Sequence, residues 1–481
     1  MLRKRFGTAL ALVAMLSACG GGGGGSGSSP TPTPTASNPA PTPTPSPTAG
    51  CSLRDRQNWA NAQLREWYLF PETLPASLDP GSYSSVEAYV DALTATARSQ
   101  GRDRFFTYVT SIREEDAFYA SGSSAGFGFR LSYDTAARRV FVAETFEGTP
   151  ALAASIDRGT EILAVGESGG NLRLVSDLMA SGGSNAVIAA LGPPDPGVSR
   201  VLRVSDGAGT REINISKTDY SLTPVSSRYG ARIIDDGGKR VGYVNLRTFI
   251  SQADPALRDA FAGFRAQGIS EVIVDLRYNG GGLVSIAELM GDLLGGNRST
   301  AEVFSYTTFR ASKSEYNESR NFAPKPQSIG STKIAFIGTG GTASASELVI
   351  NAFIPYLRAN AGLIGSNTYG KPVGQIALDR PGCDDRLRVI AFATQNAARQ
   401  GDYYDGLASK VEASCQAVDD VSRPLGDPQE ASTRAALDYL AGRQCTRIPT
   451  GKTGAALRAG DRELLTPERP TTAQREVPGL F

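Results

Sequence analysis

The stretch that decides the fold reads KIAFIGTGGTASASE and covers residues 333–347. An apolar run (residues 333–338) predicts a strand, and the Gly-rich turn after it leads into an apolar helix that begins near Ser344 and Ser346. A serine at a strand-to-helix turn is held exposed, with backbone N–H groups beside it. The stretch therefore predicts an α/β fold that presents a serine nucleophile at the end of a strand.

The chain contains no histidine, so a serine nucleophile needs another base. Lys371 is the natural candidate, because it lies 27 residues after Ser344 in the uncharged setting TYGKPVGQ (residues 368–375). A lysine acts as a base only where burial or neighbouring charges lower its pKa from about 10.4. Gln375 can orient the amine by a hydrogen bond. The pattern indicates a serine–lysine hydrolase.

A third segment, DLRYNGGG (residues 275–282), ends another expected strand. Its glycines allow backbone N–H groups to approach a substrate carbonyl closely, and the N–H of Ala345 can join them. Taken singly, a Ser-rich turn is often a helix N-cap, a Gly triplet is often a turn, and a Gly-Lys pair is common on surfaces. Their occurrence together in a chain without histidine predicts an acyl-transfer site.

Length and charge limit the class of protein. At 481 residues the chain exceeds the usual size of one domain, so we expect several domains. The net charge of +1, without a dense block of Lys and Arg, argues against nucleic acid as a partner. No metal, nucleotide or organic cofactor is expected.

Residues 1–19 predict a lipoprotein signal peptide. A basic start (residues 3–5) and a short apolar run precede LSAC (residues 16–19), which resembles a bacterial lipobox with Cys19 as the lipidated residue. The apolar run is too short to span a bilayer, and an ordinary signal peptide with an incidental cysteine is the alternative. Gly20 stands where an inner-membrane retention signal usually places Asp, which favours the outer membrane, facing the periplasm. Residues 20–50 are rich in Gly, Pro, Ser and Thr and predict a tether.

Four cysteines follow Cys19, namely Cys51, Cys383, Cys415 and Cys445. In an oxidising periplasm an even number suggests two disulfides, for which three connectivities are possible. We expect Cys383–Cys415 to close a loop and Cys51–Cys445 to tie the two ends of the folded body together. Zinc is disfavoured, because the sequence has neither histidine nor a Cys-x-x-Cys spacing.

The rest of the chain predicts a multi-domain α/β protein. Residues 51–122 have helical periodicity and predict a helical N-terminal domain, residues 123–218 alternate strand-like runs with turns, and residues 446–481 predict an exposed or poorly ordered tail. Residues 219–445 predict an α/β core, with strands at 240–246, 271–276 and 333–338 and helices at 254–267, 285–294 and 346–357.

Residues 123–218 resemble a PDZ domain, with strands at 127–133 and 139–144, a short helix at 150–156, and GTEILAV (residues 159–165) matching a typical strand of that fold. GFGF (residues 126–129) resembles the carboxylate-binding loop. The resemblance implies that the backbone N–H groups of Phe127 and Gly128 hold a C-terminal carboxylate while the peptide adds as a strand to the sheet edge. Phe129 or Leu131 would form the floor of the side-chain pocket.

Together these segments resemble the C-terminal processing, or tail-specific, peptidases, over roughly residues 120–440. The resemblance implies that Ser344 rather than Ser346 is the nucleophile, that Lys371 is the base with Gln375 as its helper, and that the N–H groups of Gly281 and Ala345 form the oxyanion hole. Gly280 departs from the family, which often has proline there, and the interval from Ser344 to Lys371 is slightly longer than usual.

The family implies a lipid-anchored endopeptidase of the bacterial cell envelope that recognises protein and peptide substrates through their C-termini and needs no cofactor. Its oligomeric state stays open. The alternative is a catalytically silent peptide- or ligand-binding lipoprotein on the same fold. A penicillin-recognising enzyme is set aside, because the chain has no Ser-x-x-Lys spacing.

Overall fold

The computed structural model describes residues 50–450 and 462–481. The expected signal peptide with Cys19, the tether up to residue 49, and residues 451–461 lie outside this part of the chain. Among the described residues, no helix combines the length and the apolar character needed to cross a membrane.

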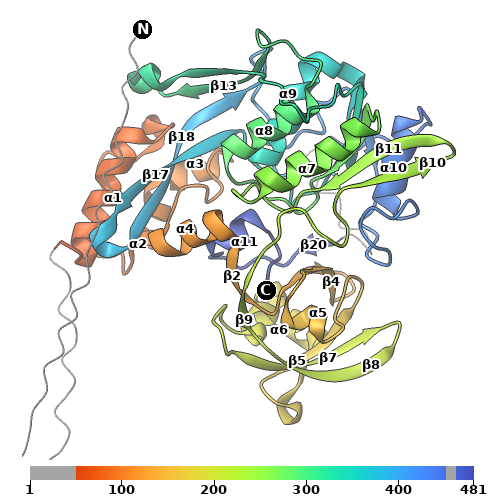
Figure 1. Ribbon diagram of the computed structural model, residues 1–481. Coiled ribbons are helices and arrows are strands. Elements are labelled where there is room, and N and C mark those ends of the chain that lie inside the picture. The colour runs from red at the N-terminus through yellow and green to blue at the C-terminus, as the bar shows by residue number, and fades with distance from the viewer. Residues whose placement is uncertain (1–49, 451–461) are drawn as a thin grey trace, which may run out of the picture. The chain divides into compact units, whose positions relative to one another are not determined.

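A six-stranded sheet forms the centre of the α/β core (Figure 1). Its strand order is β10-β11-β12-β15-β16-β19, with β10–β11 antiparallel and the other pairs parallel. The strands are β10 (Arg232–Asp236), β11 (Lys239–Asn245), β12 (Glu271–Asp275), β15 (Lys333–Gly338), β16 (Ala361–Gly365) and β19 (Ala413–Gln416). Because parallel neighbours end at the same edge, the DLRYNGGG loop after β12 and the Ser344 turn after β15 meet there.

Helices cover both faces of this sheet. Three helices share one apolar cluster with the sheet, and α10 (Ala431–Leu440) contributes to a second cluster on the other face. The three helices are α7 (Ala253–Ala266), α8 (Val284–Leu294) and α9 (Ala345–Leu357). Strands buried on both faces carry apolar residues at successive positions, which explains the unbroken apolar run at 333–338. The core strands and helices expected from the sequence are confirmed, and their ends differ from the expected ones by no more than one residue.

The N-terminal region is helical, as expected, but it also supplies a strand to another sheet. β1 (Tyr108–Ser111) pairs antiparallel with β18 (Asp385–Gln395). Apolar side chains of the N-terminal helices share a cluster with residues of β17 and β18, so these helices pack against the hairpin that follows Lys371. The elements are α1 (Leu53–Trp67), α2 (Val86–Leu93), α3 (Ala95–Ser99), α4 (Ile112–Ser121), β13 (Val303–Phe309), β14 (Glu318–Asn321) and β17 (Val373–Arg380).

Residues 123–221 form a small β-rich domain, hereafter the β domain. It begins and ends with β2 (Ser123–Gly126) and β9 (Thr218–Ser221), which pair with each other where the chain enters and leaves. The expected strands and short helix occur with shifted ends. Its other elements are β3 (Phe129–Asp134), β4 (Arg139–Thr145), α5 (Pro150–Ala153), β5 (Glu161–Gly166), β6 (Arg173–Leu174), α6 (Val175–Leu191), β7 (Ser199–Asp206) and β8 (Gly209–Ser216).

The expectation of an exposed or poorly ordered tail is wrong for residues 462–481. β20 (Glu463–Leu464) adds to β3 of the β domain, and α11 (Thr472–Glu476) packs beside α4 (Figure 1). The last four residues include Leu480 and Phe481, which are 2% and 6% exposed. The many Arg, Thr, Pro and Gly residues hide any apolar periodicity in the tail, but its few apolar side chains, among them Leu480 and Phe481, are buried in clusters with other parts of the chain.

The expected disulfide pairing is also wrong. The structure joins Cys51 to Cys383 and Cys415 to Cys445, with Cα atoms 5.5 and 5.4 Å apart. The first bond ties the start of α1 to the turn between β17 and β18, and the second links β19 to the segment after α10. Sequence distance carries no information on which cysteines the fold brings together.

Candidate active site

Ser344 lies at the turn between β15 and α9 in a strained backbone conformation. It is the N-cap of α9 and has φ 56° and ψ −114°, which a non-glycine residue rarely adopts. Thr342 holds the turn, because its Oγ1 donates to the carbonyl of Leu276 at 2.8 Å and accepts the N–H of Thr339 at 2.9 Å. Such an elbow presents a side chain above a helix N-terminus.

Ser346 is placed differently from Ser344. Its side chain is fully buried, and its Oγ donates to the carbonyl oxygen of Asn279 at 3.0 Å. The same oxygen accepts the N–H of Ala343 at 3.0 Å, so the serine turn and the DLRYNGGG loop are linked directly. The hydroxyl of Ser346 is buried and already donates a hydrogen bond, so it is poorly suited to attack a substrate. This favours Ser344 as the nucleophile.

Lys371 follows β16 and lies beside Gln375 of β17. Its Nζ donates to Gln375 Oε1 at 2.9 Å, and Gln375 Nε2 in turn donates to the carbonyl of Phe106. Nζ also lies 5.1 Å from the centre of the Phe106 ring. Burial lowers the pKa of Lys371, although the carboxylate of Glu476 opposes this shift. The N-terminal domain thus supports the candidate base through Phe106, a residue that belongs to no motif in the sequence.

Glu347 joins the nucleophile and the base. One carboxylate oxygen accepts the N–H groups of Ser344 and Lys371 at 3.1 and 2.7 Å. The other accepts the N–H of Gly370 at 2.7 Å and the hydroxyl of Thr368 at 2.6 Å. Burial raises the pKa of Glu347, while these hydrogen bonds favour its ionised form. The bonds from Gly370 and Lys371 come from tertiary structure, since these residues lie 23 and 24 positions along the chain from Glu347.

The glycine loop lies against the serine turn. A Cβ added to Gly281 would stand 2.8 Å from Cβ of Ser344 and 3.1 Å from the nitrogen of Ala345, and Gly281 has φ 121°. The close contacts and the positive φ angle both exclude a side chain at this position. The N–H of Gly281 donates to Asn279 Oδ1 at 3.0 Å, so a substrate oxygen would have to share or replace that bond. Gly281 and Ala345 therefore adjoin Ser344, as an oxyanion hole requires.

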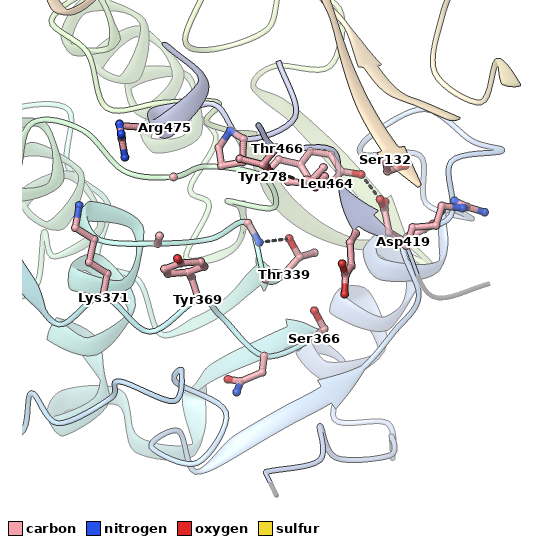
Figure 2. A pocket seen from close by; sticks show the side chains of 18 of the residues that line it. Ser132, Tyr278, Thr339, Ser366, Tyr369, Lys371, Asp419, Leu464, Thr466 and Arg475 are labelled. Atoms are coloured by element: carbon pink, nitrogen blue, oxygen red, sulfur yellow. Dashed lines mark hydrogen bonds between the residues drawn. The ribbon is translucent and has the colours of Figure 1, made fainter. Parts of the chain in front are cut away.

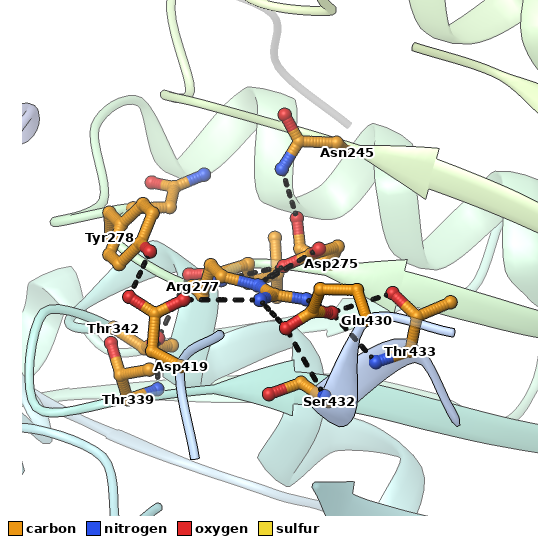
Figure 3. A network of polar contacts seen from close by, with 12 residues as sticks. Asn245, Asp275, Arg277, Tyr278, Thr339, Thr342, Asp419, Glu430, Ser432 and Thr433 are labelled. Atoms are coloured by element: carbon orange, nitrogen blue, oxygen red, sulfur yellow. Dashed lines mark hydrogen bonds and ion pairs between the residues drawn. The ribbon is translucent and has the colours of Figure 1, made fainter. Parts of the chain in front are cut away.

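A buried ionic network fixes the start of this loop (Figure 3). Arg277 donates to both oxygens of Glu430 at 2.9 Å and to Asp275 at 3.0 and 3.1 Å. Asp419 accepts from Tyr278 and from Arg158 of the β domain, the latter at 2.8 Å. All three charges of the Asp275–Arg277–Glu430 group are fully buried, so their positions are set by mutual pairing.

A cleft of about 920 Å³ passes the candidate site (Figure 2). Lys371 and Arg475 lie toward one end and Asp419 toward the other, with Tyr278 and Leu464 between them. Its wall includes Gly280 and Ala343 on the protease side and residues 462–478 of the tail on the other. The cleft therefore reaches Lys371 and Ala343, the neighbour of Ser344, while Ser344 itself is not part of its wall and the tail forms part of the boundary.

The GFGF loop holds a peptide segment, but with donors that differ from those expected. The N–H groups of Gly128 and Phe129 donate to the carbonyl oxygen of Phe481 at 2.9 and 3.2 Å. Phe127 supplies no such donor, and its own carbonyl accepts the N–H of Ala151 at 2.9 Å. Phe129 and Leu131 share an apolar cluster with Phe481, as expected for a pocket floor.

Comparison with known proteins places this geometry in a family. The model of peptidase family S41 matches residues 240–398, which include the glycine loop, Ser344 and Lys371, and the model of the peptidase S41 N-terminal domain matches residues 55–108. The chain carries domains of peptidase family S41.

The relatives of the S41 domain agree with this assignment. The chain is 29% identical to a chloroplastic C-terminal processing peptidase of Tetradesmus obliquus over 54% of each chain. It is 25% identical to a carboxyl-terminal-processing protease of Picosynechococcus, over 57% of this chain and 61% of the relative. The chain thus spans little more than half the length of these relatives. A Bacteroides fragilis structure described as an S41 protease shares the fold, with a TM-score of 0.62, 24% identity, and coverage of 80% of this chain and 97% of that one.

Proposed function

We propose that the chain is a serine endopeptidase that cleaves proteins selected through a C-terminal segment. The observation that carries the proposal is the shared carboxylate of Glu347, which holds the backbone of both Ser344 and Lys371. A serine on a strained elbow and a lysine of lowered pKa, linked through Glu347, supply a nucleophile and a base without histidine. The names of the curated relatives, C-terminal processing peptidases, support the substrate class.

The reaction follows from these groups. Neutral Lys371 takes the proton from Ser344 Oγ as the oxygen attacks the scissile carbonyl, and the N–H groups of Ala345 and Gly281 stabilise the oxyanion. Lys371 then gives the proton to the leaving amine, which leaves an acyl-enzyme. Water, deprotonated by the same amine, attacks the ester and releases the acid with Ser344 restored. In this structure Nζ donates to Gln375 Oε1 at 2.9 Å, which orients the amine.

Substrate selection belongs to the β domain in this proposal. Its GFGF loop and the edge of β3 offer backbone donors and an apolar pocket to an extended peptide, which is the mode of strand addition used by PDZ domains. We also propose that the chain is anchored through lipidated Cys19 in the outer membrane, facing the periplasm. The lipobox and the tether support this location, together with the two disulfides.

Cleavage of an unstructured protein by the purified chain tests the function. We expect Ser344→Ala to abolish cleavage and Lys371→Ala to lower kcat by about 10²- to 10⁴-fold, because a general base contributes that much. Ser346→Ala is the matched control and should retain most activity. An unchanged rate in the Ser344→Ala variant would overturn the proposal, and a wild-type chain that binds but never cleaves would indicate the silent binding protein instead. Substrates with an amidated or altered last residue test selection by the β domain.

A further inference from the structure

The peptide groove of the β domain is occupied by the chain itself. Residues 479–481 lie along β3 as an added antiparallel strand: the N–H of Phe481 donates to the carbonyl of Phe129 at 2.9 Å, and the N–H of Leu131 donates to the carbonyl of Gly479 at 2.8 Å. Together with the bonds from Gly128 and Phe129 to Phe481, this is the pattern by which a sheet edge binds a foreign peptide.

The side chain of Phe481 fills an apolar pocket. It is 6% exposed and belongs to the cluster formed by β3 and α6, which includes Phe127, Phe129 and Leu178. Gly126 leaves room for the main chain of this residue, because a Cβ there would stand 2.7 Å from the main-chain carbon C of Phe481. The groove therefore has a pocket matched to one large apolar side chain.

The same segment reaches the active-site cleft. The carbonyl of Glu476 accepts the N–H of Gly280 at 2.9 Å, and a Cβ on Gly280 would stand 2.3 Å from the carbonyl oxygen of Arg475. Proline, which the C-terminal processing peptidases often have at this position, would lack that N–H. Glycine at 280 thus allows the tail to lie against the loop that carries the oxyanion donors.

One buried guanidinium connects the segment to the loop after β12. Arg130 of β3 donates through the same nitrogen to the carbonyls of Pro478 and Tyr278, at 2.8 and 2.6 Å. Near the base, Tyr119 donates to the carboxylate of Glu476 at 2.9 Å, and Arg475 lies over the ring of Tyr108. Groove, segment and catalytic loop therefore form one continuous set of contacts.

We propose that residues 471–481 are a built-in peptide ligand that occupies the groove and part of the cleft together, and that substrates must displace it. The inference rests on the proposed function and names its substrate class: peptides whose end places a large apolar residue, such as the Leu-Phe of residues 480–481, in the Phe481 pocket. The state with the segment docked is the resting state, in which Lys371 Nζ is held by Gln375.

Peptide binding tests the inference without catalysis. A fluorescent peptide with the sequence of residues 471–481 is titrated into the full chain carrying Ser344→Ala, alone or with Phe481→Ala or Gly479→Ala. Gly479 has φ 85° and lies 2.8 Å, measured from an added Cβ, from the carbonyl of Leu131, so alanine there breaks the pairing. We expect the Phe481→Ala and Gly479→Ala variants, the release variants, to bind the peptide about tenfold more tightly than the parent. This factor applies if the groove is open in about a tenth of the parent molecules, because the apparent affinity falls in proportion to that fraction.

Two controls distinguish undocking of the segment from the groove from a general destabilisation of the fold. Tyr316→Ala, an aromatic truncation at a position 48% exposed, should bind the peptide like the parent. A peptide with aspartate in place of the final phenylalanine should not bind any variant. Equal binding to parent and folded release variants would overturn the inference, since the segment would then be a permanent part of the fold.

Two further measurements test the inference without relying on one variant alone. In the unmutated chain, excess peptide should speed hydrogen exchange at the amide of Phe481, and unchanged exchange would contradict displacement. On a short unstructured reporter, Phe481→Ala should raise kcat/KM about tenfold, and the added peptide should lower it again. If the wild type and the Phe481→Ala variant were both inactive, the proposed function would be refuted, while the peptide titration would still show whether the segment can be displaced.

Discussion

At the scale of single residues, the proposed mechanism makes the reaction depend on the charge of Lys371. Burial lowers its pKa; Arg475 and Arg388 lower it further, while Glu476 and Asp103 raise it. Only the neutral amine accepts a proton, so activity should rise with pH through the pKa of Lys371, below the ordinary value of about 10.4. Glu476→Gln removes the carboxylate that favours the ammonium form. We therefore expect the rising limb of kcat/KM against pH to shift to lower pH.

The matched control for that profile is Glu468→Gln, because Glu468 is an exposed tail carboxylate that accepts a hydrogen bond from Asn185 at 3.0 Å. A limb that stays in place, or moves to higher pH, in Glu476→Gln would contradict the role given to Glu476.

The candidate residues that stand in short motifs could be named from the sequence. Ser344, Lys371 and Gln375 stand in local patterns that carry their own chemical meaning, and the structure brings the last two within hydrogen-bonding distance. Glu347 and Phe106 could not be predicted in their roles, because their partners come from other parts of the chain. A hydrogen bond between distant segments leaves no periodicity in either of them.

At the scale of elements, the end of β12 depends on Arg277. Its guanidinium neutralises Asp275 and Glu430, and all three side chains are fully buried. Arg277→Ala leaves two buried carboxylates without their partner, so we expect a loss of about 3–5 kcal/mol in the free energy of unfolding. Arg258→Ala, which breaks an exposed pair within α7, should cost about 0.3–0.5 kcal/mol. Denaturant unfolding measures both, and equal losses would refute the importance of the network.

The same scale shows why elements were easier to predict than their partners. The buried strands of the core carry unbroken apolar runs and its amphipathic helices carry periodic ones. The expected first and last residues of these elements therefore agree closely with the structure. Residues 471–481 carry no such pattern, because a segment that adds to a sheet edge is held by its backbone and by one or two anchoring side chains. Composition therefore suggested an exposed tail where the structure has a bound one.

At the scale of the whole molecule, the two disulfides should contribute unequally to stability. Cys51–Cys383 spans 332 residues and Cys415–Cys445 spans 30. A cross-link restricts the unfolded chain more when it closes a longer loop, so the first bond should stabilise by about 2 kcal/mol more than the second. We expect the pair Cys51→Ser with Cys383→Ser to lower the midpoint of denaturant unfolding more than Cys415→Ser with Cys445→Ser. Both variants should cleave normally while folded, because neither bond touches Ser344, Lys371 or Gln375; a larger loss from the short loop would show that native contacts, rather than chain entropy, set the balance.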